Sequence, residues 1–96
     1  MAIVEVTVFH LRADADPTSL LAADRRVQTE LIPNQPGFLR RTTAREGSDW
    51  LVLTLWATGL DAAAYADVAE GHPVQAEFES HIDPASVRTR RFETLD

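Results

Sequence analysis

The segment from Asp49 to Ala57 constrains the fold most, because it is apolar on both of the faces that a β-strand presents. Within it, three leucines alternate with two tryptophans, a valine and a threonine. Successive side chains of a strand point to opposite sides of a sheet, and burying either set stabilises the folded chain. We therefore expect this strand to lie inside a sheet that is covered on both faces.

Strand and helix signals alternate along the rest of the chain. The glycine-containing link at residues 46–48 joins two extended runs and predicts a hairpin. Residues 16–17 (Asp-Pro) and Thr58 are of the types that begin helices. This order predicts one α+β domain over residues 1–96, a ferredoxin-like β-α-β-β-α-β fold with a four-stranded antiparallel sheet. The expected strands cover residues 3–11, 37–45, 49–57 and 87–95, and the expected helices begin at residues 17, 58 and 73.

Composition excludes several kinds of chemistry. The chain contains no cysteine and no lysine, and its net charge is −6. These absences exclude thiol nucleophiles, disulfides and lysine Schiff bases. Net acidity argues against a nucleic-acid partner. No run approaches the ~20 apolar residues of a membrane span, so we expect no membrane partner and a cytoplasmic location. The histidines at positions 10, 72 and 81 lack the spacing of metal ligands, so no metal centre is expected.

The open face of the predicted sheet indicates a partner. We expect the aliphatic side chains of residues 4, 6 and 8 and the three leucines of the third strand to face the helices. An uncovered apolar patch on the other face is the kind of surface that binds a partner or a ligand. The sequence therefore predicts a homodimer whose paired sheets enclose a pocket for a small molecule. The side chains expected on the open face are Phe9, Trp50, Val52 and Trp56, beside Glu5, Thr7 and Thr54.

Three short motifs give the chain a family resemblance. They are Gln-Pro-Gly-Phe-Leu-Arg at residues 35–40, the strand at residues 50–56 that ends in tryptophan, and His-Pro at residues 72–73. With the opening aliphatic strand, they make nearly the whole chain resemble the dimeric α/β barrel of the antibiotic-biosynthesis-monooxygenase type. The resemblance implies this fold and a dimer. Members of the family include cofactor-free oxygenases, haem-degrading enzymes and isomerases.

The resemblance also bears on cofactors. Its haem-degrading branch relies on an asparagine on the first strand and a tryptophan on the second helix. Here the first strand carries Glu5, Thr7 and Phe9 without an asparagine, and the second helix has Tyr65 in place of tryptophan. Haem degradation is therefore disfavoured, and we expect no cofactor.

Three residues are candidates for catalysis. His72 lies close to where family members carry a histidine at the pocket mouth, so it is either a general base or a histidine that caps a helical turn. Glu5 is either a base with raised basicity beside tryptophans or one half of an ion pair with an arginine. Arg90 either stabilises an oxyanion or forms a surface ion pair.

The remaining candidates would line the pocket. Because alternation sends one member of each arginine pair to each face, one arginine per strand is expected to reach the ligand. The candidate substrate-binding residues are Thr7, Phe9, Arg40, Thr54, Trp56 and Tyr65.

The function that this resemblance implies is a cofactor-independent monooxygenase. It would bind a small aromatic or quinol-type substrate in a pocket between the helices and the sheet of a homodimer. Two alternatives stay open, because no motif with a sharp spacing rule is present and a fold does not fix a function. One is a non-catalytic ligand-binding or regulatory dimer, and the other is an isomerase or cyclase that uses the same pocket without oxygen.

Overall fold

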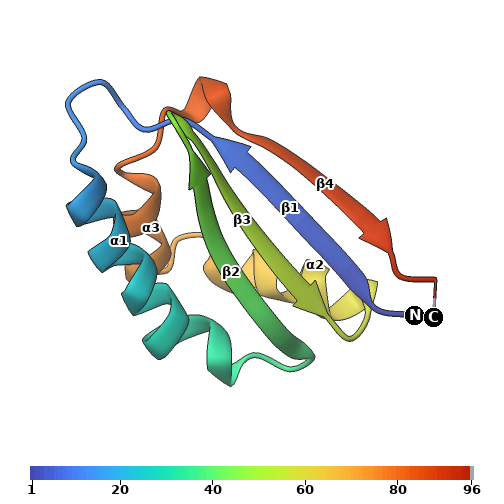
Figure 1. The fold of residues 1–96 in the computed structure, drawn as a ribbon. Coiled ribbons are helices and arrows are strands. Elements are labelled where there is room, and N and C mark those ends of the chain that lie inside the picture. Colours follow the sequence, from blue (N-terminus) through green and yellow to red (C-terminus); the bar gives the residue numbers. More distant parts are fainter. Residues whose placement is uncertain (96) are drawn as a thin grey trace.

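Four antiparallel strands and three helices make up the chain in the computed structural model, which describes residues 1–95 (Figure 1). The last residue of the expected domain, Asp96, lies outside the described residues. In chain order the elements are β1 (Ile3–Phe9), α1 (Pro17–Arg26), β2 (Phe38–Glu46), β3 (Asp49–Trp56), α2 (Gly59–Ala69), α3 (Pro73–Glu79) and β4 (Arg88–Glu93), with a π-helical turn at Val27–Leu31 and 3-10 turns at Ile32–Asn34 and Pro84–Ser86.

The strand order β2-β3-β1-β4 confirms the ferredoxin-like prediction. The central strand β1 pairs over its whole length with residues 50–56 of β3, and β2 and β4 form the two edges. The two ends of the described chain lie side by side, and the amide of Ala2 donates a hydrogen bond to the Thr94 side chain at 3.2 Å (Figure 1).

Local sequence explains where the helices begin and end. Asp16 caps α1 by accepting a hydrogen bond from the Thr18 amide at 3.2 Å, and Thr58 caps α2 by accepting one from the Asp61 amide at 3.1 Å. A regular helix cannot continue through Pro33, which has no N–H to donate, and the chain passes from α1 into the π-helical turn before it. None of the helices in the described part of the chain is long and apolar enough to cross a membrane.

The two faces of the sheet are the reverse of the sequence expectation. The tryptophans of β3 are packed under the helices, with Trp50 5% and Trp56 1% exposed, and so are Phe9 and Val52. The aliphatic set of β1 and β3 lies on the open face instead, where Val8 is 38% exposed. The larger side chains bury more apolar area per residue, so they take the side that the helices cover.

The centre of the open face nevertheless remains apolar, although the edge strands place Arg40, Arg88 and Arg90 on the same side. Paired residues of neighbouring strands share a face, so the register places side chains of the edge strands beside the aliphatic set. From β4, Phe92 joins it and is 42% exposed. We name this surface the aliphatic face and define it by Val4, Val6, Val8, Leu51, Leu53, Leu55 and Phe92.

On the covered side, α1 and α3 pack on one end of the sheet and α2 packs on the other (Figure 1). Phe9 meets Phe78 of α3 edge to face, with ring centroids 6.0 Å apart. At the other end, the Trp56 ring packs against Tyr65 of α2 at 5.1 Å. A cavity lies in the space between these two aromatic contacts.

Gly37 is required by both backbone geometry and space. Its φ of +79° is one that side chains rarely adopt, and an added Cβ would lie only 2.2 Å from Cγ of Asp61, in the first turn of α2. Gly47, in the hairpin between β2 and β3, has a φ of +58° with open space around it.

We therefore expect Gly37→Ala to lower the free energy of unfolding more than Gly47→Ala does. The hairpin variant should lose about 1 kcal/mol from its left-handed backbone alone. The Gly37 variant should lose more stability, because the Asp61 side chain must also move away from Thr58, the residue that caps α2. Urea denaturation at one protein concentration measures both, and equal losses would contradict the role of Asp61.

Candidate active site

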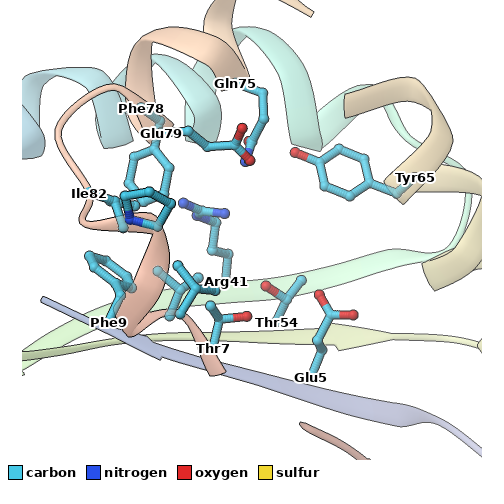
Figure 2. Close-up of a pocket in the computed structure, with 13 residues that line it drawn as sticks. Glu5, Thr7, Phe9, Arg41, Thr54, Tyr65, Gln75, Phe78, Glu79 and Ile82 are labelled. Atoms are coloured by element: carbon cyan, nitrogen blue, oxygen red, sulfur yellow. The ribbon is translucent and has the colours of Figure 1, made fainter. Parts of the chain in front are cut away.

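A cavity of about 340 Å³ lies within the chain, between the sheet and helices α2 and α3 (Figure 2). This volume is in the range of roughly 300–1,000 Å³ typical of small-molecule sites. The sheet forms its floor, and side chains from the helices close over it. Its lining residues are Glu5, Thr7, Phe9, Arg41, Val52, Thr54, Tyr65, Gln75, Phe78, Glu79, Ile82, Pro84 and Val87.

Arg41 is the cationic side chain among these residues. Its Nη2 donates a hydrogen bond to Oδ1 of Asp24 at 2.6 Å, and the two side chains are only 7% and 6% exposed. The guanidinium carbon lies 5.3 Å from the centroid of the Phe78 ring. Its Nε has no hydrogen-bond partner within residues 1–95. Arg41 is thus held from one side and has donors left for a ligand.

A β-bulge explains why Arg41, and not Arg40, faces this cavity. Phe38 pairs with Trp56 on the covered side, and simple alternation would place Arg40 on that side as well. The register shifts between Phe38 and Arg40, so that Arg40 pairs with Leu55 and Arg41 with Thr54. One extra residue in a strand moves every later side chain of that strand to the opposite face of the sheet from the one that simple alternation predicts.

Tyr65 projects from α2 across the cavity, with its hydroxyl directed toward the side chains of α3 (Figure 2). The hydroxyl is buried and has no hydrogen-bond partner in the described chain. Burial raises the pKa of this phenol above its ordinary value; the Arg41 charge opposes the shift, and Glu5 and Glu79 add to it. Near neutral pH, Tyr65 is therefore an unionised hydrogen-bond donor.

Glu5 stands on the floor beside two threonines, Thr7 and Thr54 (Figure 2). Its Oε2 accepts a hydrogen bond from Nε of Arg91 on the neighbouring edge strand at 2.7 Å. Its side chain is 22% exposed. The glutamate is thus paired with an arginine of its own protomer, and its other oxygen has no hydrogen bond to residues 1–95.

The wall from α3 adds a second carboxylate. Oε2 of Glu79 accepts a hydrogen bond from Nε2 of Gln75 at 3.0 Å, and both side chains lie over the Arg41 guanidinium in the close-up (Figure 2). No arginine or histidine of the described residues is at ion-pairing distance from Glu79.

The structure brings together most of the side chains that the sequence singled out for the pocket. They come from β1, β3 and α2, and they reach one cavity because these elements face one another across the core. The sequence candidates that line the cavity are Glu5, Thr7, Phe9, Thr54 and Tyr65.

Four other candidates lie elsewhere. Nδ1 of His72 accepts a hydrogen bond from the Val74 amide at 3.1 Å, so the ring caps α3 and does not line the cavity. Arg40 and Arg90 pair with open-face residues, and Arg90 lies over the Phe92 ring at 4.8 Å on that side. Trp56 is buried behind Tyr65 and supports the wall from outside.

Sequence reasoning missed the residues that close the cavity from above. Gln75 and Glu79 are spaced i, i+4 on α3, on a face next to the apolar positions 74, 78 and 82, and the spacing was visible in the sequence. The direction in which Arg41 points was not visible in the sequence, because nothing in the sequence marks the bulge. Among residues 1–95, no group of three or more histidine, aspartate or glutamate side chains is arranged to hold a metal ion.

Known structures share this fold. No protein-family model and no curated protein matches the sequence. SnoaB, a cofactor-independent oxygenase from Streptomyces nogalater, matches 99% of this chain and 94% of its own with a TM-score of 0.82 at 15% identity. A "putative antibiotic biosynthesis monooxygenase" from Bordetella bronchiseptica matches 98% of this chain and 97% of its own with a TM-score of 0.82 at 9% identity.

A dimeric ferredoxin-like protein of unknown function from Jannaschia sp. CCS1 matches 98% of this chain and all (100%) of its own, with a TM-score of 0.72 at 10% identity. The chain therefore has the ferredoxin-like α+β fold of the antibiotic-biosynthesis-monooxygenase proteins, as the motifs predicted. Within that fold, it is a domain whose cavity is lined by an arginine, a tyrosine and two glutamates.

Tyr65 is the one tyrosine of the chain, so phenolate absorbance reports on it alone. We expect the folded protein to form phenolate at a higher pH than the urea-unfolded chain, which should titrate near the ordinary value of about 10. The sign follows from burial, which disfavours the charged phenolate. Titration of the folded protein at the ordinary value, with circular dichroism showing that the fold persists, would contradict this environment.

Proposed function

We propose that this chain is a cofactor-independent monooxygenase-like enzyme that binds a small aromatic or quinol-type substrate in the cavity of a homodimer subunit. The observation that carries the proposal is the Tyr65 hydroxyl, which is buried at the cavity without a partner. Leaving such a group unsatisfied costs about 1–3 kcal/mol, and an oxygen atom of a bound ligand would satisfy it. The SnoaB fold match supports the same class of reaction.

The cavity walls suit a flat, apolar molecule with a few oxygen atoms. Phe9, Phe78 and Val52 supply aromatic and aliphatic surface, and polar groups approach from the floor and from the helices (Figure 2). Sites of this composition bind through apolar contact and take their orientation from a small number of polar groups.

In the proposed reaction, Glu5 accepts a proton from the substrate through the carboxylate oxygen that Arg91 leaves free. Arg41 and Tyr65 stabilise the negative charge that develops on a substrate oxygen. The electrons of the deprotonated substrate pass to dioxygen, a carbon–oxygen bond forms and the oxygen–oxygen bond breaks. A methylene carbon thereby becomes a carbonyl, and its two hydrogens leave with the second oxygen atom as water.

Oxygen uptake by the purified, metal-free protein with anthrone-like and quinol substrates tests this chemistry. We expect Glu5→Gln to slow turnover about a hundredfold or more, as loss of a general base does. Tyr65→Phe, which keeps the ring against Trp56, should slow it by about tenfold to a hundredfold. Glu70→Gln, on an exposed position after α2, is the matched control and should leave the rate unchanged.

Binding without oxygen uptake by the unmodified protein would contradict the oxygenase and favour a ligand-binding dimer. Product formation under anaerobic conditions would instead favour an isomerase or cyclase.

The dimer part of the proposal rests on the aliphatic face. The helices cover the other side of the sheet, and a contiguous apolar surface of this kind is usually occupied by a partner. The dimeric ferredoxin-like protein from Jannaschia sp. CCS1, which shares the fold, supports a second copy of the chain as that partner. The side chains named earlier as the dimer contact, Trp50 and Trp56, are buried within the protomer and do not take part.

We expect light scattering to give a dimer mass for the unmodified protein and a monomer mass for Leu53→Glu, because a carboxylate at the centre of the aliphatic face would lose its water on association. Ala63→Glu, on the exposed side of α2, is the control and should remain dimeric. A monomer mass for the unmodified protein at micromolar concentration would overturn the homodimer.

A further inference from the structure

Asp24 is a buried carboxylate whose ion-pair partner, Arg41, has a side chain that is only 7% exposed, and the proposed reaction does not use Asp24. It projects from α1 toward β2 and does not line the cavity. Its Oδ1 accepts hydrogen bonds from Arg41 at 2.6 Å and from Thr43 at 3.0 Å, and its Oδ2 accepts one from Gln28 at 2.7 Å.

A buried ion pair is weak evidence for stability, because taking two charges out of water offsets most of their attraction. What this pair does with certainty is fix a geometry. Asp24 holds Nη2 of Arg41 from the side away from the cavity, and the Phe78 ring lies against the guanidinium. The arginine is therefore constrained before any ligand arrives, as an oriented hydrogen-bond donor must be.

The same contact sets the charge of the cavity. Asp24 neutralises Arg41, and Arg91 neutralises Glu5. Glu79 is the remaining charged side chain of the lining, and in the described chain its hydrogen bond comes from the uncharged Gln75. The cavity thus offers donors without net positive charge, which favours an uncharged ligand with acceptor oxygens and disfavours a carboxylate.

We propose that Asp24 is a positioning and specificity-determining residue: by pairing with Arg41 it makes the cavity select uncharged oxygenated aromatics over their carboxylated analogues. This inference rests on the proposed function for the location of the ligand. It concerns recognition alone and is independent of whether dioxygen reacts.

The test uses naphthol and naphthoate, two ligands of one shape that differ in charge, measured by calorimetry at low ionic strength. We expect the unmodified protein to prefer naphthol. Asp24→Asn keeps the shape and the acceptor oxygen but removes the charge, and the Gln28 amide can turn to match the new NH₂ group. The variant should shift the preference toward naphthoate by about tenfold or more, as an uncompensated charge within a few ångströms does.

A second readout needs no ligand. In Asp24→Asn the Arg41 charge is no longer neutralised, so the pKa of the Tyr65 phenol should fall relative to that in the unmodified protein. A loss of packing that let water reach the phenol would also lower this pKa, because burial is what raises it, so a control for packing is needed. Thr43→Val, which removes one hydrogen bond to Asp24 and leaves the charges in place, is the control and should change neither the preference nor the titration.

Each outcome has a distinct meaning. If both probes fail to bind the unmodified protein, the proposed function fails, while the Tyr65 titration still tests Asp24. If Asp24→Asn folds with the same preference and the same titration as the unmodified protein, the inference about Asp24 is overturned. If that variant does not fold, Arg41→Gln removes the cation that Asp24 neutralises and should strengthen the preference for naphthol, and an unchanged preference in it would overturn the charge argument.

Discussion

Burial of the large aromatic side chains between sheet and helices determines the rest of this structure. Phe9, Trp50 and Trp56 leave the sheet on one side and are almost completely shielded from water there. Because strand residues alternate, the placement of these rings determines on which side the remaining residues of β1 and β3 lie. The polar residues Glu5 and Thr54 lie on the covered side, and the aliphatic residues face outward. The cavity lies where Tyr65 and Phe78 close over the floor from opposite ends (Figure 2).

The polar groups in and beside the cavity are of two kinds, paired and unpaired, and the two kinds have different uses. The pairs Asp24–Arg41 and Glu5–Arg91 fix side chains in place, since each carboxylate is held at hydrogen-bond distance. The Tyr65 hydroxyl and Nε of Arg41 are buried without a hydrogen-bond partner in the described chain. Preorganised donors of this kind act on charge that develops in a reaction without having to reorient when it appears.

Sequence patterns were sufficient for the fold and for part of the site. Helix caps at Asp16 and Thr58 and the alternation in β3 gave the element order, and the grouping of Phe9 with Glu5, Thr7 and Thr54 on one side was correct. Alternation does not say which side of the sheet the helices cover, because both faces of β3 are apolar. The prediction therefore assigned the covered face and the open face the wrong way round. The remaining positions depend on register and on tertiary contacts, which the sequence does not show. The bulge in β2 turns Arg41 toward the cavity, and the ring of His72 accepts a hydrogen bond from the Val74 amide at the start of α3.

The bulge in β2 also matters for comparing this chain with proteins of the same fold. At identities of 9–15%, a sequence alignment has few anchors along an edge strand. In a relative without the extra residue at Leu39, the side chain that faces the cavity would lie one position nearer in sequence to the equivalent of Phe38, even if both chains carried two adjacent arginines. Equivalent cavity residues in these proteins therefore have to be identified from strand pairing. Identical residues in a sequence alignment do not show which side chain faces the cavity.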